Sequence, residues 1–180
     1  MDGNYATNGY NSTYLRGFQQ TNHDGIVNFD TIFPGHYSGR AIHTHLLTHL
    51  NTTINPKNGT MQIGSGTRVA QIGQLFWPED LRSAVEATYP YNTNTQDIVS
   101  NDDDMWSVKQ ASAAYDPFPR YVYLGDKVQD GLFAWIQIGV NTTQDWTSDD
   151  YYSIAAYMGE NGGYANSDSK AMGGGDGGAP

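Results

Sequence analysis

Alternating apolar and polar positions predict two strands in the first third of the chain. After a turn signal at residues 23–25, the run Gly25–Phe33 places alternate apolar side chains on one face, with a period of two. A Pro-Gly pair at 34–35 ends this run. The next run, Arg40–Leu50, puts the histidines at positions 43, 45 and 49 on one face. We therefore expect two strands joined by a short loop.

Three later runs also predict strands, and one segment predicts a helix. The strand candidates are Arg68–Trp77, Arg120–Leu124 and Leu132–Val140. The last of them carries Phe133 and Trp135, which we expect in the core. The segment Pro78–Ala87 has acidic residues in its first turn and apolar residues at helical spacing. It predicts one short helix.

Composition divides the chain into three parts. Residues 1–14 are polar, and residues 147–180 are rich in Gly, Ser and Asn. Neither segment can bury enough apolar surface to repay its ordering entropy, so we expect a polar N-terminal segment and a disordered tail. Residues 15–146 carry the predicted strands, with a surface loop predicted at 55–66. The expected fold is a single all-β domain, a β-sandwich with one short helix.

The charge balance narrows the class of partner. The chain of 180 residues has 9 basic and 19 acidic residues, which gives a net charge of −10. Because phosphate binding draws on a surplus of Lys and Arg, we expect no nucleic acid and no membrane partner, and a small molecule instead. No apolar run approaches the roughly 20 residues that cross a membrane, and the first residues do not have the pattern of a signal peptide.

The residues best suited to chemistry lie together in the stretch PGHYSGRAIHTH, at 34–45. The chain has no cysteine, so nitrogen and oxygen ligands must hold any transition metal. His43 and His45, two positions apart on a predicted strand, can chelate one ion, although a pair with this spacing is as often structural. Tyr37 favours a hard, strongly Lewis-acidic ion such as Fe³⁺. We interpret the acidic run Asp102–Asp104 as solvated surface.

Several segments, in the same order along the chain, resemble one family. They are LRG at 15–17, DGIVNFDTIFPGHY at 24–37, GRAIHTH at 39–45, GQLFW at 73–77, PYNTNT at 90–95, DPF at 116–118 and DGLFAWI at 130–136. Together they resemble the intradiol ring-cleavage dioxygenases, and within that family the secreted fungal branch. The resemblance extends from residue 15 to residue 140. Its most specific part is Pro-Gly-x-Tyr followed by Arg-x-x-His-x-His.

The resemblance implies a β-sandwich in which two tyrosinates and two histidines hold one non-haem Fe³⁺. It places one tyrosinate at Tyr37 and the histidines at His43 and His45. Tyr37 would leave the iron when a catechol binds and would accept a substrate proton. Arg40 would face the bound ring and stabilise the electron-rich substrate, and Gln74 would help to orient it. The implied reaction converts a catechol-type aromatic diol and O₂ into a muconate-type diacid.

The resemblance also implies an extracellular protein. Four Asn-x-Ser/Thr sequons suit a glycosylated secreted protein, although chance alone supplies roughly two. They lie at Asn11, Asn51, Asn58 and Asn141.

Other interpretations remain open. The second tyrosinate of the family lies in an upstream motif that residues 1–20 lack, and Tyr5, Tyr10 and Tyr14 do not fit that motif. We therefore expect the chain to correspond to the C-terminal part of a dioxygenase, to a truncated gene product or to a shortened paralogue, with exposed sheet edges that favour a homodimer. The alternative is a non-catalytic β-sandwich module that binds aromatic diols or iron without turnover. A carbohydrate-binding sandwich ranks below both, and the simplest structural role of Arg40 is a salt bridge.

Overall fold

The computed structural model describes residues 11, 15–62, 66–149 and 156–165. Residue contacts divide the chain into two compact units. Unit 1 comprises residues 1–4, 33–46 and 73–140, and unit 2 comprises residues 5–32, 47–72 and 141–180. The predicted site residues, at positions 37, 40, 43, 45 and 74, all belong to unit 1.

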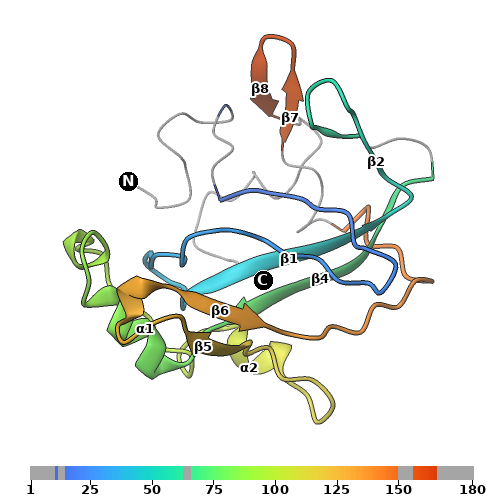
Figure 1. Ribbon diagram of the computed structural model, residues 1–180. Coiled ribbons are helices and arrows are strands. Elements are labelled where there is room, and N and C mark those ends of the chain that lie inside the picture. Colours follow the sequence, from blue (N-terminus) through green and yellow to red (C-terminus); the bar gives the residue numbers. More distant parts are fainter. Residues whose placement is uncertain (1–10, 12–14, 63–65, 150–155, 166–180) are drawn as a thin grey trace. The chain divides into compact units, whose positions relative to one another are not determined.

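Two long strands position most of the predicted site. Strand β1, His43–Leu50, pairs with strand β4, Arg68–Phe76 (Figure 1). Both lie within predicted strand runs, where β-branched and other apolar residues suit a pleated, half-buried surface. The histidines of the motif open β1, and Gln74 lies near the end of β4. The pairing of these strands thus explains how residues distant in sequence meet.

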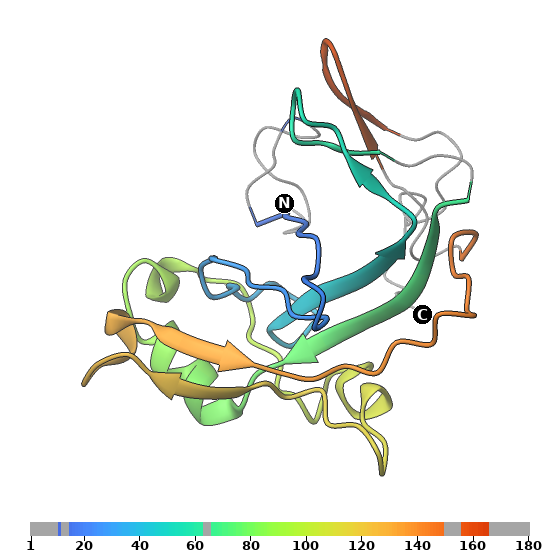
Figure 2. The same ribbon diagram turned by 45° about the vertical axis from the view of Figure 1, so that its right-hand side comes forward.

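A second pair of strands in unit 1 forms an antiparallel hairpin. Strand β5, Arg120–Tyr123, pairs with β6, Leu132–Trp135, through a connection that contains the 3₁₀ helix η3, Val128–Asp130 (Figure 2). The prediction that Phe133 and Trp135 lie in the core is wrong, because their side chains are 56% and 44% exposed. An apolar run can specify a strand without specifying which face a second layer covers.

The predicted helix is present as α1, Glu79–Glu86. Pro78 precedes it, the acidic Glu79 and Asp80 occupy its first turn, and Leu81 and Val85 are buried on one side. Acidic side chains there interact favourably with the positive end of the helix dipole, so the residues of this segment explain where the helix begins. The other helical segments are η2, Tyr91–Thr93, and α2, Ser107–Gln110.

Arg82, on α1, ties this helix to the chain after it. Its side chain is fully buried, with an exposed fraction of 2%. One guanidinium nitrogen donates to Glu79 Oε1 at 2.6 Å and to Asn101 Oδ1 at 3.1 Å, and another donates to the Val99 carbonyl oxygen. A buried arginine needs acceptors that replace its lost hydration, and these three supply them for the two terminal nitrogens, whereas Nε has no hydrogen-bond partner among the described residues.

The apolar core of unit 1 lies beside the motif histidines. Ala41, Ile42 and Phe76 have almost no exposed surface. The ring of Phe76 also packs against that of His43, with centroids 5.8 Å apart. The residues that carry the candidate chemistry are therefore held by a packed core.

Unit 2 contains two short hairpins. Strand β2, Thr53–Ile54, pairs with β3, Met61–Gln62, so residues 55–60 of the predicted surface loop form the turn of a small hairpin. Strand β7, Ala156–Gly159, pairs with β8, Gly162–Ala165. Composition predicts no fixed structure for this segment of 147–180, whereas the structure describes a hairpin at 156–165. Tyr157 and Tyr164 face each other across it with ring centroids 5.6 Å apart, a cross-strand aromatic contact that composition does not reveal.

Part of unit 2 departs from its predicted structure. The run Gly25–Phe33 forms no strand, and Ile26, Phe29 and Ile32 are 55%, 49% and 63% exposed. An alternating pattern becomes a strand only when another strand pairs with it, and no described segment does so here. The predictions for residues 1–10 and 12–14 lie outside the described residues, as do those for 166–180.

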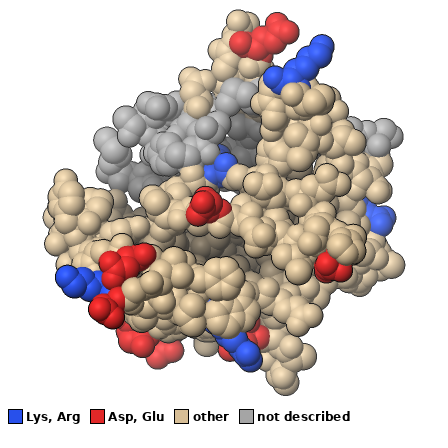
Figure 3. Space-filling view, in the orientation of Figure 1, with Lys and Arg blue, Asp and Glu red and all other residues tan. Residues whose placement is uncertain are grey.

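The described surface reflects the acidic composition. On the face drawn in Figure 3, the Lys and Arg side chains are scattered, whereas several Asp and Glu side chains gather together. Among the described helices, none is long and apolar enough to cross a membrane.

Candidate functional site

A tight turn connects two of the predicted site residues. Tyr37 and Arg40 face each other as an isolated antiparallel bridge, and Gly39 between them has a φ of 90°. This left-handed conformation costs glycine little and costs other residues more. The Tyr-x-Gly-Arg spacing is thus the spacing of a turn that brings tyrosine and arginine together just before β1 begins.

Hydrogen bonds from the segment after α1 hold the turn on both sides of Tyr37. The Asn94 side chain donates from Nδ2 to the His36 carbonyl oxygen at 2.7 Å. The backbone N–H of Ser38 donates to Gln96 Oε1 at 2.9 Å. The two backbone neighbours of Tyr37 are therefore fixed by side chains roughly 60 residues further along the chain.

His36 adds a third attachment. Its side chain is buried, with Nδ1 2.8 Å from Glu86 Oε2 at the end of α1 and Nε2 donating to the Gln96 carbonyl oxygen at 3.0 Å. This histidine thus has a structural role in the turn and takes no part in the histidine pair of β1.

Three side chains of the motif bring together the atoms that could bind a metal ion. The Nε2 atoms of His43 and His45 lie 3.2 Å apart, and the Tyr37 hydroxyl oxygen lies 3.5 Å from His43 Nε2. On the other side of the His43 ring, Nδ1 donates to the Ala41 carbonyl oxygen at 2.6 Å. A carbonyl oxygen can only accept, so the proton of a neutral His43 lies on Nδ1 and leaves the Nε2 lone pair free.

Both histidines are held in the neutral form. Burial lowers the pKa of His43 below its ordinary value, and the hydrogen bond to Ala41 opposes this only in part. Loss of hydration around the ring, aided by His43 and Arg40, lowers the pKa of His45 to about 4. His45 is exposed, so water still reaches part of its ring. At neutral pH both rings can offer a lone pair to a metal ion.

The tyrosine completes a donor set of mixed type. Tyr37 is half-buried, and burial raises the pKa of its phenol, although the Arg40 guanidinium acts in the opposite direction. A hard cation beside the hydroxyl would instead lower the pKa of the phenol, since a metal ion favours the deprotonated form of its ligand. Two neutral imidazoles and one phenol whose donor atoms converge fit a ferric ion, so these residues pass this test of the predicted site.

The donor set lacks one member within the described part of the chain. No group of three His, Cys, Asp or Glu side chains gathers there to hold a metal ion, and the tyrosine supplies the third donor of the motif. The upstream tyrosines at positions 5, 10 and 14 lie outside the described residues.

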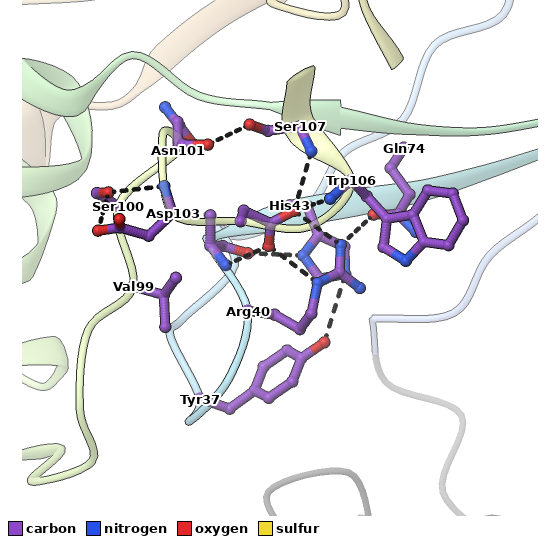
Figure 4. A network of polar contacts seen from close by, with 12 residues as sticks. Tyr37, Arg40, His43, Gln74, Val99, Ser100, Asn101, Asp103, Trp106 and Ser107 are labelled. Atoms are coloured by element: carbon purple, nitrogen blue, oxygen red, sulfur yellow. Dashed lines mark hydrogen bonds and ion pairs between the residues drawn. The ribbon is translucent and has the colours of Figure 1, made fainter. Parts of the chain in front are cut away.

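Arg40 and Gln74 meet beside Tyr37 and His43 (Figure 4). Arg40 is buried and donates from Nη2 to Gln74 Oε1 at 2.6 Å. Gln74 is itself buried, and its backbone N–H donates to Gln110 Oε1 at 3.1 Å. The structure therefore brings all five predicted site residues into one region of unit 1.

Asp104 is a site residue that the sequence analysis misses. Its side chain has no exposed surface and forms an ion pair with Arg40, with Nε and Oδ2 2.9 Å apart. The interpretation of Asp102–Asp104 as solvated surface is wrong for this member of the run, although Asp102 and Asp103 are exposed. Burial acts to raise the pKa of Asp104, but hydrogen bonds from Arg40 and from backbone N–H groups outweigh it and lower the pKa below its ordinary value.

Comparisons with known proteins agree with the motif at the level of the family. The sequence matches no protein-family model and no curated protein. Among solved structures, the chain is similar to an intradiol ring-cleavage dioxygenase from the mite Tetranychus urticae, at 26% identity and a TM-score of 0.54. It is also similar to a crystal structure of a dioxygenase, at 26% identity and a TM-score of 0.53.

In both cases the match covers 69% of this chain and 52% of the other, so the chain spans about half the length of these dioxygenases. The likeness confirms the all-β class with a short helix.

Proposed function

We propose that this chain carries the site of an Fe³⁺-dependent intradiol dioxygenase, which cleaves a catechol-type aromatic diol with O₂. The product would be a muconate-type diacid, in which both oxygen atoms of O₂ are retained and one ring carbon–carbon bond is broken. One observation carries the proposal: His43 Nε2 lies 3.5 Å from the Tyr37 hydroxyl oxygen and 3.2 Å from His45 Nε2, so the three candidate ligand atoms gather around His43. The likeness to an intradiol dioxygenase at 26% identity supports it.

The metal ligands would be Tyr37, His43 and His45, with a fourth ligand outside the described residues. A bound ferric ion would supply Lewis acidity, which lowers the pKa of the hydroxyl groups of a diol beside it. The neutral rings of His43 and His45 suit this role, because a protonated imidazole cannot bind a cation.

The remaining roles belong to groups that touch the diol. The phenolate oxygen of Tyr37, whose hydroxyl lies 3.5 Å from His43 Nε2, would accept a hydroxyl proton of the diol. The positive charge of Arg40 would stabilise negative charge that develops on the ring as it reacts. Gln74, hydrogen-bonded to Arg40, would help to orient the ring.

A second candidate function is a non-catalytic module that binds iron or an aromatic diol without turnover. The observation that favours it is the incomplete donor set, since the described residues offer three donors of this type. An ion held by three protein donors binds more weakly than one held by four, and Tyr37 would then have no second phenolate beside it.

Three finer features are also proposals. The sequence motifs favour the fungal secreted branch of the family and an extracellular location, and the exposed sheet edges expected from the missing upstream strands favour a homodimer. The four sequon asparagines are all exposed, so glycosylation is sterically open at Asn11, Asn51, Asn58 and Asn141. Digestion of the protein from its native source with an N-glycosidase, followed by electrophoresis, would reveal a mass shift if any of them carries a glycan.

The visible absorption spectrum tests the main proposal. Purified protein is mixed with Fe³⁺, then with catechol in the absence of O₂, and oxygen uptake is measured after air is admitted. A tyrosinate-to-iron charge-transfer band that shifts with catechol, followed by O₂ consumption and a muconate product, supports the dioxygenase. A band that shifts with catechol but is followed by no O₂ consumption supports the binding module. A protein that stays colourless contradicts an iron site at Tyr37.

A further inference from the structure

We infer that Asp104 is a positioning residue, which sets the direction of the Arg40 guanidinium toward the bound diol. This inference rests on the proposed function, because it concerns the residue that would face the ring. It is based on the hydrogen bonds of one buried carboxylate, which connect Arg40 to the backbone on either side of the site.

Both oxygen atoms of the Asp104 carboxylate accept several hydrogen bonds. Oδ2 accepts from Arg40 Nε at 2.9 Å and from the Ala41 backbone N–H at 2.7 Å. Oδ1 accepts from Arg40 Nη2 at 3.3 Å and from the backbone N–H groups of Trp106 and Ser107 at 2.8 Å and 3.0 Å. A buried carboxylate with this many donors has one orientation available to it, so its hold on the guanidinium is directional.

The arrangement determines which N–H groups of Arg40 remain for a ligand. A guanidinium has five N–H groups in a rigid plane. Asp104 and Gln74 take the N–H of Nε and both N–H groups of Nη2. The two N–H groups of Nη1 are the ones that these bonds leave for the diol, and the plane that contains them is fixed by the bonds to Asp104.

The same carboxylate connects Arg40 to the ligand histidine. The peptide groups of Ala41 bond in both directions: its N–H donates to Asp104, and its carbonyl oxygen accepts from His43 Nδ1. Asp104 thus fixes the start of β1 on one side and the start of α2 on the other. A shift of this carboxylate would move the guanidinium relative to His43, and such a shift of about 1 Å can cost on the order of 100-fold in rate.

Burial explains why the arginine needs this partner. Arg40 and Asp104 have side-chain exposures of 10% and 0%. Removing one member of a buried ion pair leaves an uncompensated charge, which then seeks water or another partner. Without Asp104, the guanidinium would turn away from its present direction.

The experiment compares Asp104→Asn with Asp102→Asn, which makes the same charge change at an exposed position of the same acidic run. An asparagine at 104 must point its NH₂ at N–H donors on one side or the other, so it cannot reproduce the carboxylate. We expect the Asp104→Asn protein to bind Fe³⁺ with wild-type stoichiometry and charge-transfer colour, and its kcat for catechol to fall about 100-fold with a smaller change in KM. The Asp102→Asn protein should keep the wild-type kcat.

Asp104→Glu serves as the second variant, because it keeps the charge but moves the carboxylate by one methylene. Its kcat should lie between those of the wild type and Asp104→Asn. A wild-type kcat in Asp104→Glu or in folded Asp104→Asn overturns the inference. An equal loss of iron binding and kcat in both Asp104 variants also overturns it, since the residue would then serve the metal site as a whole.

A readout without iron separates this inference from the proposed function. In the metal-free protein, NMR of the arginine Nε–H groups should show a slowly exchanging Arg40 signal, assigned by its loss in Arg40→Lys. The signal should persist in Asp102→Asn and be lost or exchange rapidly in the Asp104 variants. If the wild-type protein fails to turn over catechol, the proposed function fails, and the NMR result still decides the hold on Arg40. Retention of the signal in the Asp104→Asn protein overturns it.

Discussion

The peptide groups of Ala41 link the imidazole of His43 to the carboxylate of Asp104. The carbonyl oxygen accepts from His43 Nδ1 at 2.6 Å, and the N–H donates to Asp104 Oδ2 at 2.7 Å. Outer partners of this kind fix the tautomer and the orientation of a histidine that binds a metal ion. In the proposed site, the face that His43 would offer to a metal ion is therefore determined by residues that would not touch the metal.

His45→Ala should abolish Fe³⁺ binding, because it removes one of the three convergent donors and leaves two. His49→Ala is the matched control, since His49 lies on the same strand beyond the donor cluster. Iron stoichiometry after gel filtration, measured by a colorimetric chelator, would distinguish them. Full stoichiometry in the His45→Ala protein would contradict the assignment of this ligand.

Asn94→Ala should weaken iron binding by about 10- to 100-fold, the usual effect of removing a partner that orients a metal ligand. The asparagine side chain holds the backbone carbonyl directly before Tyr37. Its loss would free the turn without removing a ligand. Titration with Fe³⁺ in the presence of a competing chelator measures the change in Kd. Asn92→Ala is the control, because Asn92 is exposed and its side chain makes a long bond, 3.5 Å, to the Ala87 carbonyl oxygen.

Asp104→Asn should lower the free energy of unfolding by about 3 to 5 kcal/mol at pH 7, the usual cost of breaking a buried ion pair. The pKa of Asp104 is lowered in the folded protein, so its ionised form stabilises the fold above the ordinary pKa, and this contribution is lost as the pH falls through the folded pKa. The difference between wild type and variant should therefore shrink below pH ~4. Urea unfolding at pH 7 and pH 3 would test this, and a difference independent of pH would contradict it.

Arg82→Met should destabilise unit 1 by about 2 to 4 kcal/mol, because it leaves the buried acceptors on Asn101 and Val99 without a donor. Arg120→Met, at an exposed position, should have little effect. Thermal unfolding followed by circular dichroism compares the two variants. An equal decrease in Tm in the two variants would contradict this prediction, because the buried hydrogen bonds of Arg82 would then add nothing to the stability of the fold beyond what an exposed arginine adds.

The sequence could predict the parts of this site that are local. Tyr37, His43 and His45 lie within nine residues, and the strand period alone places the two histidines on one face. The Asp104 pairing joins residues 64 positions apart, and no local pattern reveals such a pair. The sequence does contain one indication that Asp104 is not simply solvated. It lies just before α2, where its carboxylate accepts hydrogen bonds from the first backbone N–H groups.

The limits of prediction for the fold have a similar cause. β1, β4 and α1 follow from their own residues, since periodicity and end signals are contained in each segment. Whether Gly25–Phe33 forms a strand depends on a pairing partner, and whether Phe133 is buried depends on a covering layer. Both are properties of the surroundings, which an alternating pattern does not encode.

The hydrogen bonds on either side of Tyr37 restrict its backbone but leave its side chain free to rotate. The His36 carbonyl and the Ser38 N–H are both anchored, so the backbone at Tyr37 has little room to move. The side chain between them can still rotate about its own bonds. If Tyr37 acts as proposed, its exchange with an incoming diol would need a change of rotamer and no opening of the loop, which is slower. Departure and return of this ligand would keep pace with catalysis while the scaffold around it stays still.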